Sequence, residues 1–298
     1  MSKPISKNRQ AVPAISRRDL LAGAAGIAAA AITRTGWAQE EVWRVVKNGR
    51  INQSVSRWCY NKIPLEKFCR LCAQMGLKGI DLLEPNELPA AKNAGLVCTM
   101  LFSHSLTEGL AHAKNHDQCL AKLRTSIDAA SEFGFPNVIC FPGNRYGISE
   151  EDGTKNTVEG IRKILPYAEQ KNVTLCMEYL NSKVDHKDYM FDNMKFGVEV
   201  CKQVASDHLK ILYDIYHAQI MEGDIIRTIQ TYKQYIGHYH TGGVPGRKDI
   251  DESQELYYPA IMKAILKTGY TGYVAHEFVP KASDPLKSLA KAIEICDV

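Results

Sequence analysis

Residues 173–179 read Val-Thr-Leu-Cys-Met-Glu-Tyr, an apolar run of strand length that ends in a carboxylate. The run Leu-Lys-Ile-Leu-Tyr-Asp-Ile at 209–215 repeats this design, and an amphipathic stretch of helix length, 189–205, separates the two. Short apolar runs that alternate with helical patterns are typical of parallel strands joined by crossover helices. These residues therefore predict a β-α-β unit, and the same alternation continues along the chain in both directions.

Eight strand-like runs are present, at 51–55, 79–83, 97–102, 137–141, 173–179, 209–215, 236–240 and 273–278. Helical patterns alternate with them at about 65–75, 86–94, 115–133, 156–170, 189–205, 221–234, 257–268 and 284–296. Eight units in one unbroken series favour an α/β fold of the (β/α)₈ TIM barrel type, in a single domain. A doubly wound open sheet stays the alternative, but no Gly-x-Gly-x-x-Gly motif follows the first strand to support it.

The first 38 residues resemble an export signal. Arg17 and Arg18 stand directly before an Ala/Gly-rich apolar run at 20–32, and the small residues around 36–38 offer a cleavage site. This run is shorter than the ~20 residues that cross a bilayer. We therefore expect a twin-arginine signal at 1–38, removed after export to the periplasm or the cell exterior, then a polar segment at 39–50 and the barrel at 51–298. An uncleaved membrane tether and a tail with two chance arginines are the alternatives.

The net charge of +4 comes from this N-terminal segment. It holds six of the 37 Lys and Arg residues and one of the 33 Asp and Glu residues, which leaves 31 bases and 32 acids for the rest. A nearly neutral body lacks the basic surface that binds nucleic acid. We expect a small-molecule substrate, no nucleic-acid partner and no stable membrane span, while a homo-oligomer stays open.

The nine cysteines are scattered through predicted strands and helices, unlike the disulfide framework of a small secreted domain. Cys69 and Cys72 form the one close pair. They fall within a helical pattern and have no second pair at zinc-finger spacing, so core packing is favoured for both.

Four of the strand-like runs end in side chains that can bind a metal: Glu178, Asp214, His240 and Glu277. They close four consecutive runs, and the active site of a TIM barrel forms at the C-terminal ends of its strands. Buried carboxylates repel one another and raise one another's pKa values unless a cation joins them. The pattern predicts one divalent ion, with Mn²⁺, Mg²⁺ or Co²⁺ suited to this oxygen-rich set and Zn²⁺ or Fe²⁺ compatible with it. Isolated strand-end acids, salt-bridged or solvated, are the alternative.

Three basic side chains near the same rim are candidates for substrate binding. His217 follows Asp214 by three residues, in what we expect to be a loop, where it can hydrogen-bond a substrate oxygen. Arg247 lies in a Gly/Pro-rich loop and can pair with a carboxylate or a hydroxyl, and His104 follows the third strand. Solvated loop side chains are the alternative for His217 and Arg247.

Several stretches carry a resemblance to a known family: Asn181-Ser-Lys-Val-Asp-His186, Tyr213-Asp-Ile-Tyr-His-Ala-Gln219, Gly242-Gly-Val-Pro-Gly-Arg247, Tyr257-Tyr-Pro259 and Gly272-Tyr-Val-Ala-His-Glu-Phe278. From about residue 50 to its end the chain resembles the xylose isomerase-like TIM barrels, within them the hydroxypyruvate isomerase and ketose 3-epimerase branch. The resemblance implies that the four strand-end side chains bind the metal and that Glu178 and Glu277 double as the acid/base pair. It also implies that His217 and Arg247 hold the substrate. His240 departs from the Gln that hydroxypyruvate isomerases commonly have there, and residues 185–189 depart from their Pro-Gly stretch.

Moving a hydrogen between the carbons of an α-hydroxy carbonyl requires removal of a proton next to the carbonyl, which leaves an enediolate. A metal chelated by both oxygens stabilises this charge, and two carboxylates can take and return the proton. With the resemblance, this predicts an isomerase of the hydroxypyruvate/tartronate semialdehyde type, which interconverts an aldehyde and a ketone.

Other functions fit the same residues. A ketose 3-epimerase or a keto-sugar lyase or dehydratase would use the same metal site, and a barrel that binds a sugar without chemistry would not need both glutamates. An endonuclease acting on abasic DNA needs further metal ligands and a basic groove, which the nearly neutral body argues against.

Overall fold

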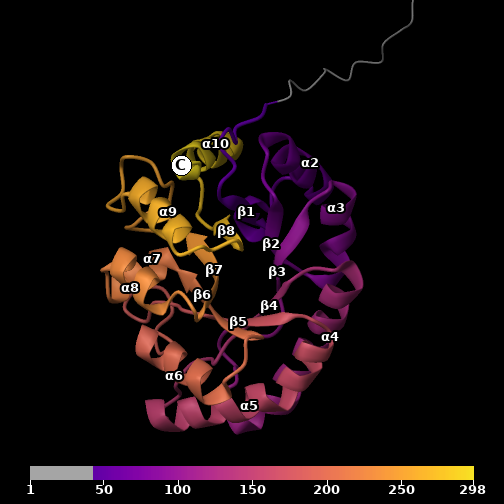
Figure 1. Cartoon of the computed structure of the whole chain (residues 1–298), viewed down its shortest axis with the longest axis vertical. Helices are drawn as coiled ribbons and strands as arrows, with labels where there is room; N and C mark the ends of the chain where they lie inside the picture. The colour runs from indigo at the N-terminus through magenta and orange to yellow at the C-terminus, as the bar shows by residue number, and fades with distance from the viewer. Residues whose placement is uncertain (1–42) are drawn as a thin grey trace, which may run out of the picture. The chain divides into compact units, whose positions relative to one another are not determined.

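The computed structural model describes residues 43–298, so the expected twin-arginine signal at 1–38 lies outside the described residues. Within the described part, eight parallel strands pair in chain order, and β1 pairs with β8 to close the barrel. Figure 1 shows these strands at the centre with the helices arranged around them. The predicted (β/α)₈ barrel is confirmed.

The strands are β1 (Asn52–Ser56), β2 (Gly79–Leu83), β3 (Val97–Leu101), β4 (Asn137–Cys140), β5 (Thr174–Glu178), β6 (Leu209–Asp214), β7 (Ile236–Thr241) and β8 (Tyr273–His276). The α-helices are α2 (Leu65–Met75), α3 (Leu88–Asn93), α4 (His116–Phe133), α5 (Glu150–Gln170), α6 (Met194–Val204), α7 (Ile215–Met221), α8 (Ile225–Tyr232), α9 (Tyr258–Lys267) and α10 (Pro285–Cys296). Short 3₁₀ helices occupy Arg57–Tyr60, Pro85–Glu87 and Ala113–Asn115. Every strand lies within two residues of its predicted bounds.

The strands are apolar along their length because both of their faces are buried. Helices cover the outer face, and the inner face lines the barrel interior. All four residues of β4, Asn-Val-Ile-Cys, are buried. The interior also contains polar side chains that are fully buried: Ser54, Asp81, Thr99 and His238. This polar layer lies among β1, β2, β3 and β7.

Helix α5 begins at Glu150, six residues before its predicted start. The Ser149 hydroxyl caps it by accepting a hydrogen bond from the Asp152 N–H at 3.0 Å, and acidic residues fill the first turn. Gly153 is a weak helix former in this turn. A Cβ there would lie 2.8 Å from the Met190 sulfur, so a larger residue would require the end of the Met190 side chain to shift.

The expectation that His217 lies in a loop was wrong, because helix α7 follows β6 with no residue between them. The Asp214 carboxylate caps this helix: its Oδ1 accepts hydrogen bonds from the N–H groups of Tyr216 at 2.8 Å and His217 at 3.3 Å. One side chain thus ends the strand and starts the helix. His217 is held on the first helical turn, fully buried.

All nine cysteines are free, and eight of them are buried. Cys69 and Cys72 are buried on α2, as the packing interpretation predicted, and burial raises the pKa of both thiols. Across residues 43–298, no helix combines the length and the apolar character that crossing a membrane requires.

Candidate active site

The structure brings the four strand-end side chains to one point at the C-terminal rim of the barrel. Glu178 ends β5, Asp214 ends β6, His240 is the next-to-last residue of β7, and Glu277 directly follows β8. All four are buried, and each offers one ligand atom within 4.8 Å of the other three. We call these residues the carboxylate cluster.

The two ring nitrogens of His240 face different groups. Its Nδ1 lies 2.5 Å from Glu277 Oε2, 3.2 Å from Glu178 Oε1 and 3.8 Å from Asp214 Oδ2. Its Nε2 lies 2.8 Å from Asp81 Oδ2, below the cluster in the barrel interior. Nδ1 is therefore the atom that His240 presents to the carboxylates.

The pKa values of the three carboxylates are shifted because these acids are buried close together. Burial, with the charge of Glu277, raises the pKa of Glu178, and burial raises the pKa of Asp214 to about 7. Burial would also raise the pKa of Glu277, but Arg247 and His240 hold it well below its usual range. Three carboxylate oxygens and an imidazole nitrogen within reach of one another fit a divalent cation, which would relieve this repulsion.

Arg247 lies against the carboxylate cluster and is not a surface side chain. Its Nη2 donates to Glu277 Oε2 at 2.6 Å and to Asp214 Oδ2 at 3.0 Å. The guanidinium lies 5.5 Å from the ring centroids of both Trp58 and Tyr216, within the range of cation–π contacts. Its charge therefore offsets part of the negative charge of the cluster.

His217 is oriented by an asparagine. The Asn181 Oδ1 accepts from the backbone N–H groups of Val184 and Asp185, so its amide nitrogen faces His217 Nδ1, at 2.6 Å. Nδ1 must then accept, which leaves the proton on Nε2. Burial and the nearby Arg247 lower the pKa of His217 well below its usual value, so the ring is neutral.

The Nε2 of His217 points toward the cluster. It lies 3.6 Å from Asp214 Oδ2, and among the described residues it has no hydrogen-bond partner. A neutral imidazole N–H that is buried and unpaired beside a carboxylate cluster is a ready donor to a ligand oxygen.

A cavity of about 430 Å³ opens beside the cluster. Its polar lining consists of Glu84, Glu178, His186, Arg247 and Glu277. Its apolar lining consists of Leu82, Phe102, Leu106, Ile139, Phe141 and Leu180, with the Trp58 ring beside them. A small molecule in this cavity would contact both glutamates and have an apolar wall behind it.

His104 does not join this site, contrary to the expected substrate contact. Its Nδ1 lies 3.1 Å from the Ser105 carbonyl oxygen, and its Nε2 accepts from the Phe141 N–H at 3.3 Å. Both nitrogens are thus used by the backbone, and burial lowers the pKa of the ring to about 4. The structure gives His104 a packing position against the Phe141 ring, outside the lining of the cavity.

Two residues at the site were not identified from the sequence. The Trp58 indole N–H donates to Glu277 Oε1 at 2.5 Å. Asp81 lies below the cluster on β2, within the run Gly-Ile-Asp-Leu-Leu. A carboxylate inside a buried apolar strand is costly unless it is paired, and that was the available signal.

Comparisons with known proteins show which family the chain matches. A family model described as xylose isomerase-like TIM barrel matches residues 69–296. A putative hydroxypyruvate isomerase of Drosophila melanogaster is 25% identical over 233 residues, which cover 72% of this chain and 85% of that protein. A 2-oxo-tetronate isomerase of Cupriavidus necator is 34% identical over 115 residues, 39% of this chain and 44% of that one.

Among solved structures, the family 2 AP endonuclease of Brucella melitensis has the same fold, with a TM-score of 0.70 at 20% identity over 80% of this chain and 95% of that one. The fold, the family match and the relatives agree. Because the match spans most of its length, the chain belongs to the xylose isomerase-like TIM barrel family.

Proposed function

We propose that this protein is an isomerase that interconverts an aldehyde and a ketone of the hydroxypyruvate/tartronate semialdehyde type. The observation that carries the proposal is the pair Glu178 and Glu277, which line one cavity from β5 and from the end of β8. Two carboxylates in contact with the same small molecule can remove and return a proton. Relatives named as isomerases support this function over the alternatives.

One divalent ion fits the carboxylate cluster. Glu178, Asp214, Glu277 and the Nδ1 of His240 would hold it, and this donor set suits Mn²⁺, Mg²⁺ or Co²⁺, with Zn²⁺ or Fe²⁺ compatible. When bound, such an ion polarises a carbonyl and stabilises negative charge on substrate oxygens. The buried position of all four side chains keeps bulk water from competing for the same sites.

Residues of the chain transfer the protons, hydrogen-bond the substrate and position the Glu277 carboxylate. One glutamate takes the proton from the hydroxyl-bearing carbon, which gives the enediolate. The hydroxyl proton passes to the former carbonyl oxygen, and a glutamic acid returns a proton to the former carbonyl carbon. The Nε2–H of His217 donates to a substrate oxygen as charge develops there. Arg247 and the Trp58 indole hold the Glu277 carboxylate in place.

Deuterium exchange tests the function. Metal-loaded protein in D₂O is incubated with hydroxypyruvate, tartronate semialdehyde and a panel of ketoses, and label is located by NMR. If the protein is this isomerase, hydroxypyruvate and tartronate semialdehyde should interconvert, with label at the carbon next to the carbonyl. Label at C3 of a ketose would instead indicate a 3-epimerase, and exchange in none of the compounds would favour a binding protein.

Substitution of Asn181 tests the role of the His217 tautomer. We expect Asn181→Ala to lower kcat/KM about tenfold, because His217 can then place its proton on either nitrogen. Steady-state kinetics measure the effect, and Asn86→Ala on the exposed surface is the matched control. Unchanged kcat/KM in Asn181→Ala would mean that this orientation is not needed.

We also propose export by the twin-arginine route, with the barrel beginning near residue 51. The twin arginine and the short apolar run after it support this. In a host with a working twin-arginine pathway, the wild type is expected in the periplasm without its first residues, whereas Arg17→Lys combined with Arg18→Lys stays in the cytoplasm at full length. Full-length wild type in the membrane fraction would indicate a tether, and undisturbed export of the variant would contradict the proposal.

A further inference from the structure

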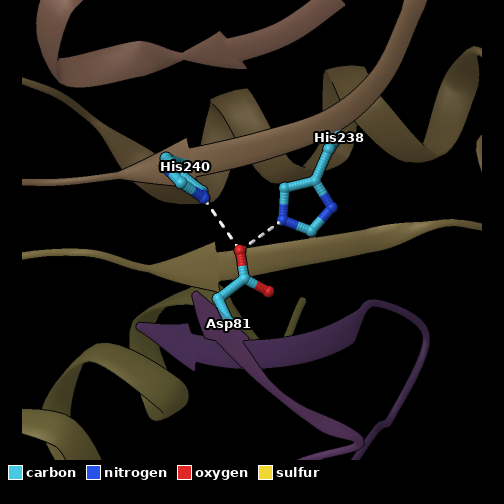
Figure 2. A group of neighbouring side chains, drawn as sticks. All are labelled: Asp81, His238 and His240. Atoms are coloured by element: carbon cyan, nitrogen blue, oxygen red, sulfur yellow. Dashed lines mark hydrogen bonds and ion pairs between the residues drawn. The ribbon is translucent and has the colours of Figure 1, made fainter. Parts of the chain in front are cut away.

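A buried hydrogen-bond hub lies directly below the carboxylate cluster. Asp81 Oδ2 accepts from the Nε2 atoms of His238 and His240, at 2.8 Å each. Figure 2 shows the Asp81 carboxylate between the two rings, with both dashed lines ending on the same oxygen. The other oxygen, Oδ1, accepts from the hydroxyls of Ser54, at 3.2 Å, and Thr99. All five side chains are fully buried.

We propose that Asp81 is the positioning residue that fixes the tautomer and the direction of His240, so that Nδ1 is presented to the metal. An ionised carboxylate only accepts hydrogen bonds, so the Nε2 of His240 must carry the proton. The lone pair of a neutral ring is then on Nδ1, the atom that faces Glu178, Asp214 and Glu277. This inference rests on the metal site of the proposed function.

The connectivity explains why an acid is needed at this position. A metal-bound imidazole that donates its other N–H to a carboxylate is held in one orientation and is a stronger ligand. Ser54 and Thr99 fix Asp81 from the side opposite to the histidines. The hub therefore couples β1, β2 and β3 to a ligand on β7, and rotation of the His240 ring would break it.

Asp81, His238 and His240 also come close enough to be considered as a metal site of their own. The two 2.8 Å separations are hydrogen-bond distances, whereas two atoms bound to one ion at about 2.1 Å each would lie roughly 3.0 Å or more apart. Each ring would also have to give up its Nε2 proton, while four donors already satisfy Asp81. The geometry therefore points to one ion above the hub and none within it.

The test is the affinity for Mn²⁺ alone, measured by calorimetry on the full-length protein. Asp81→Asn keeps the shape of the side chain but can turn an N–H toward His240, which favours the wrong tautomer. We expect its Mn²⁺ dissociation constant to rise about 10- to 100-fold. In a His240→Ala background, which has no ring to orient, the same change should alter the constant less than about twofold, since the coupling is pairwise.

A matched control separates positioning from loss of stability. Thr99→Val removes one hydrogen bond to Asp81 with little change of shape and without touching His240, so Mn²⁺ affinity should stay within about threefold of the wild type. Equal losses in Thr99→Val and Asp81→Asn would overturn the proposal, as would an undiminished effect of Asp81→Asn in the His240→Ala background.

A second measurement needs no variant of Asp81 and stands if that variant does not fold. In the Zn²⁺-loaded wild type, ¹⁵N NMR of the imidazoles should show His240 with its proton on Nε2 and the metal on Nδ1. The reverse assignment, or two ions per chain, would overturn the proposal. Metal binding with this tautomer but no turnover of any compound would refute the proposed function and leave this inference standing.

Discussion

Replacing Glu277 by glutamine is expected to abolish turnover while leaving the barrel folded. The amide has the shape of the carboxylate but cannot take a proton, and loss of a positioned general base costs about 10²- to 10⁴-fold in kcat. Trp58 and Arg247 donate to both Glu277 oxygens and keep the carboxylate ionised, the form that can accept a proton. Substrate binding should persist, because the cavity lining is otherwise unchanged.

Deuterium exchange, substrate affinity and metal content are measured on Glu277→Gln at saturating metal, since this residue is also an expected ligand. The matched control is Glu252→Gln, the same change at an exposed position away from the cavity, which should behave as the wild type. Turnover at the wild-type rate in Glu277→Gln would remove this residue from catalysis and leave Glu178 without its partner.

Removal of the metal is expected to have the second large effect, on stability as well as activity. Burial raises the pKa of Glu178 and Asp214, so the folded protein without an ion must hold these acids against their mutual repulsion. An ion present at about 100 times its dissociation constant contributes roughly 2.7 kcal/mol. For a barrel of this size that corresponds to a melting temperature lower by about 5 to 10 °C after chelation, with no remaining turnover.

Differential scanning calorimetry before and after treatment with a chelator measures the shift, and return of both properties on adding Mn²⁺ shows that the loss is reversible. Asp214→Asn is the informative companion, because a chain that has lost one ligand should respond less to the chelator. Full activity and an unchanged melting temperature in protein shown by elemental analysis to be free of metal would contradict the site.

The fold and the position of the cluster were accessible from the sequence because they depend on local patterns. Apolar runs alternating with helical patterns require a parallel sheet, and the ends of parallel strands meet at one rim. Glu178 and Asp214 could therefore be placed together from their positions at strand ends. Glu277 follows the same rule from one residue beyond β8.

Features that depend on side-chain direction or on distant pairing were not accessible in this way. Asp81 and His238 are 157 residues apart and meet only because the barrel closes, so no local pattern joins them. The helical position of His217 was missed because Asp214 both ends a strand and caps a helix. His104 was placed near the substrate because its strand points there, whereas the loop after β3 turns its ring to the backbone.

The proposed function depends on a divalent cation that joins the three carboxylates and the imidazole of the cluster. Anomalous diffraction from crystals of the Mn²⁺-loaded protein tests it most directly. One peak per chain is expected, at bonding distance from Glu178, Asp214, Glu277 and the Nδ1 of His240. Crystals grown at saturating Mn²⁺ that show no peak there, or show these side chains turned away from one another, would contradict it.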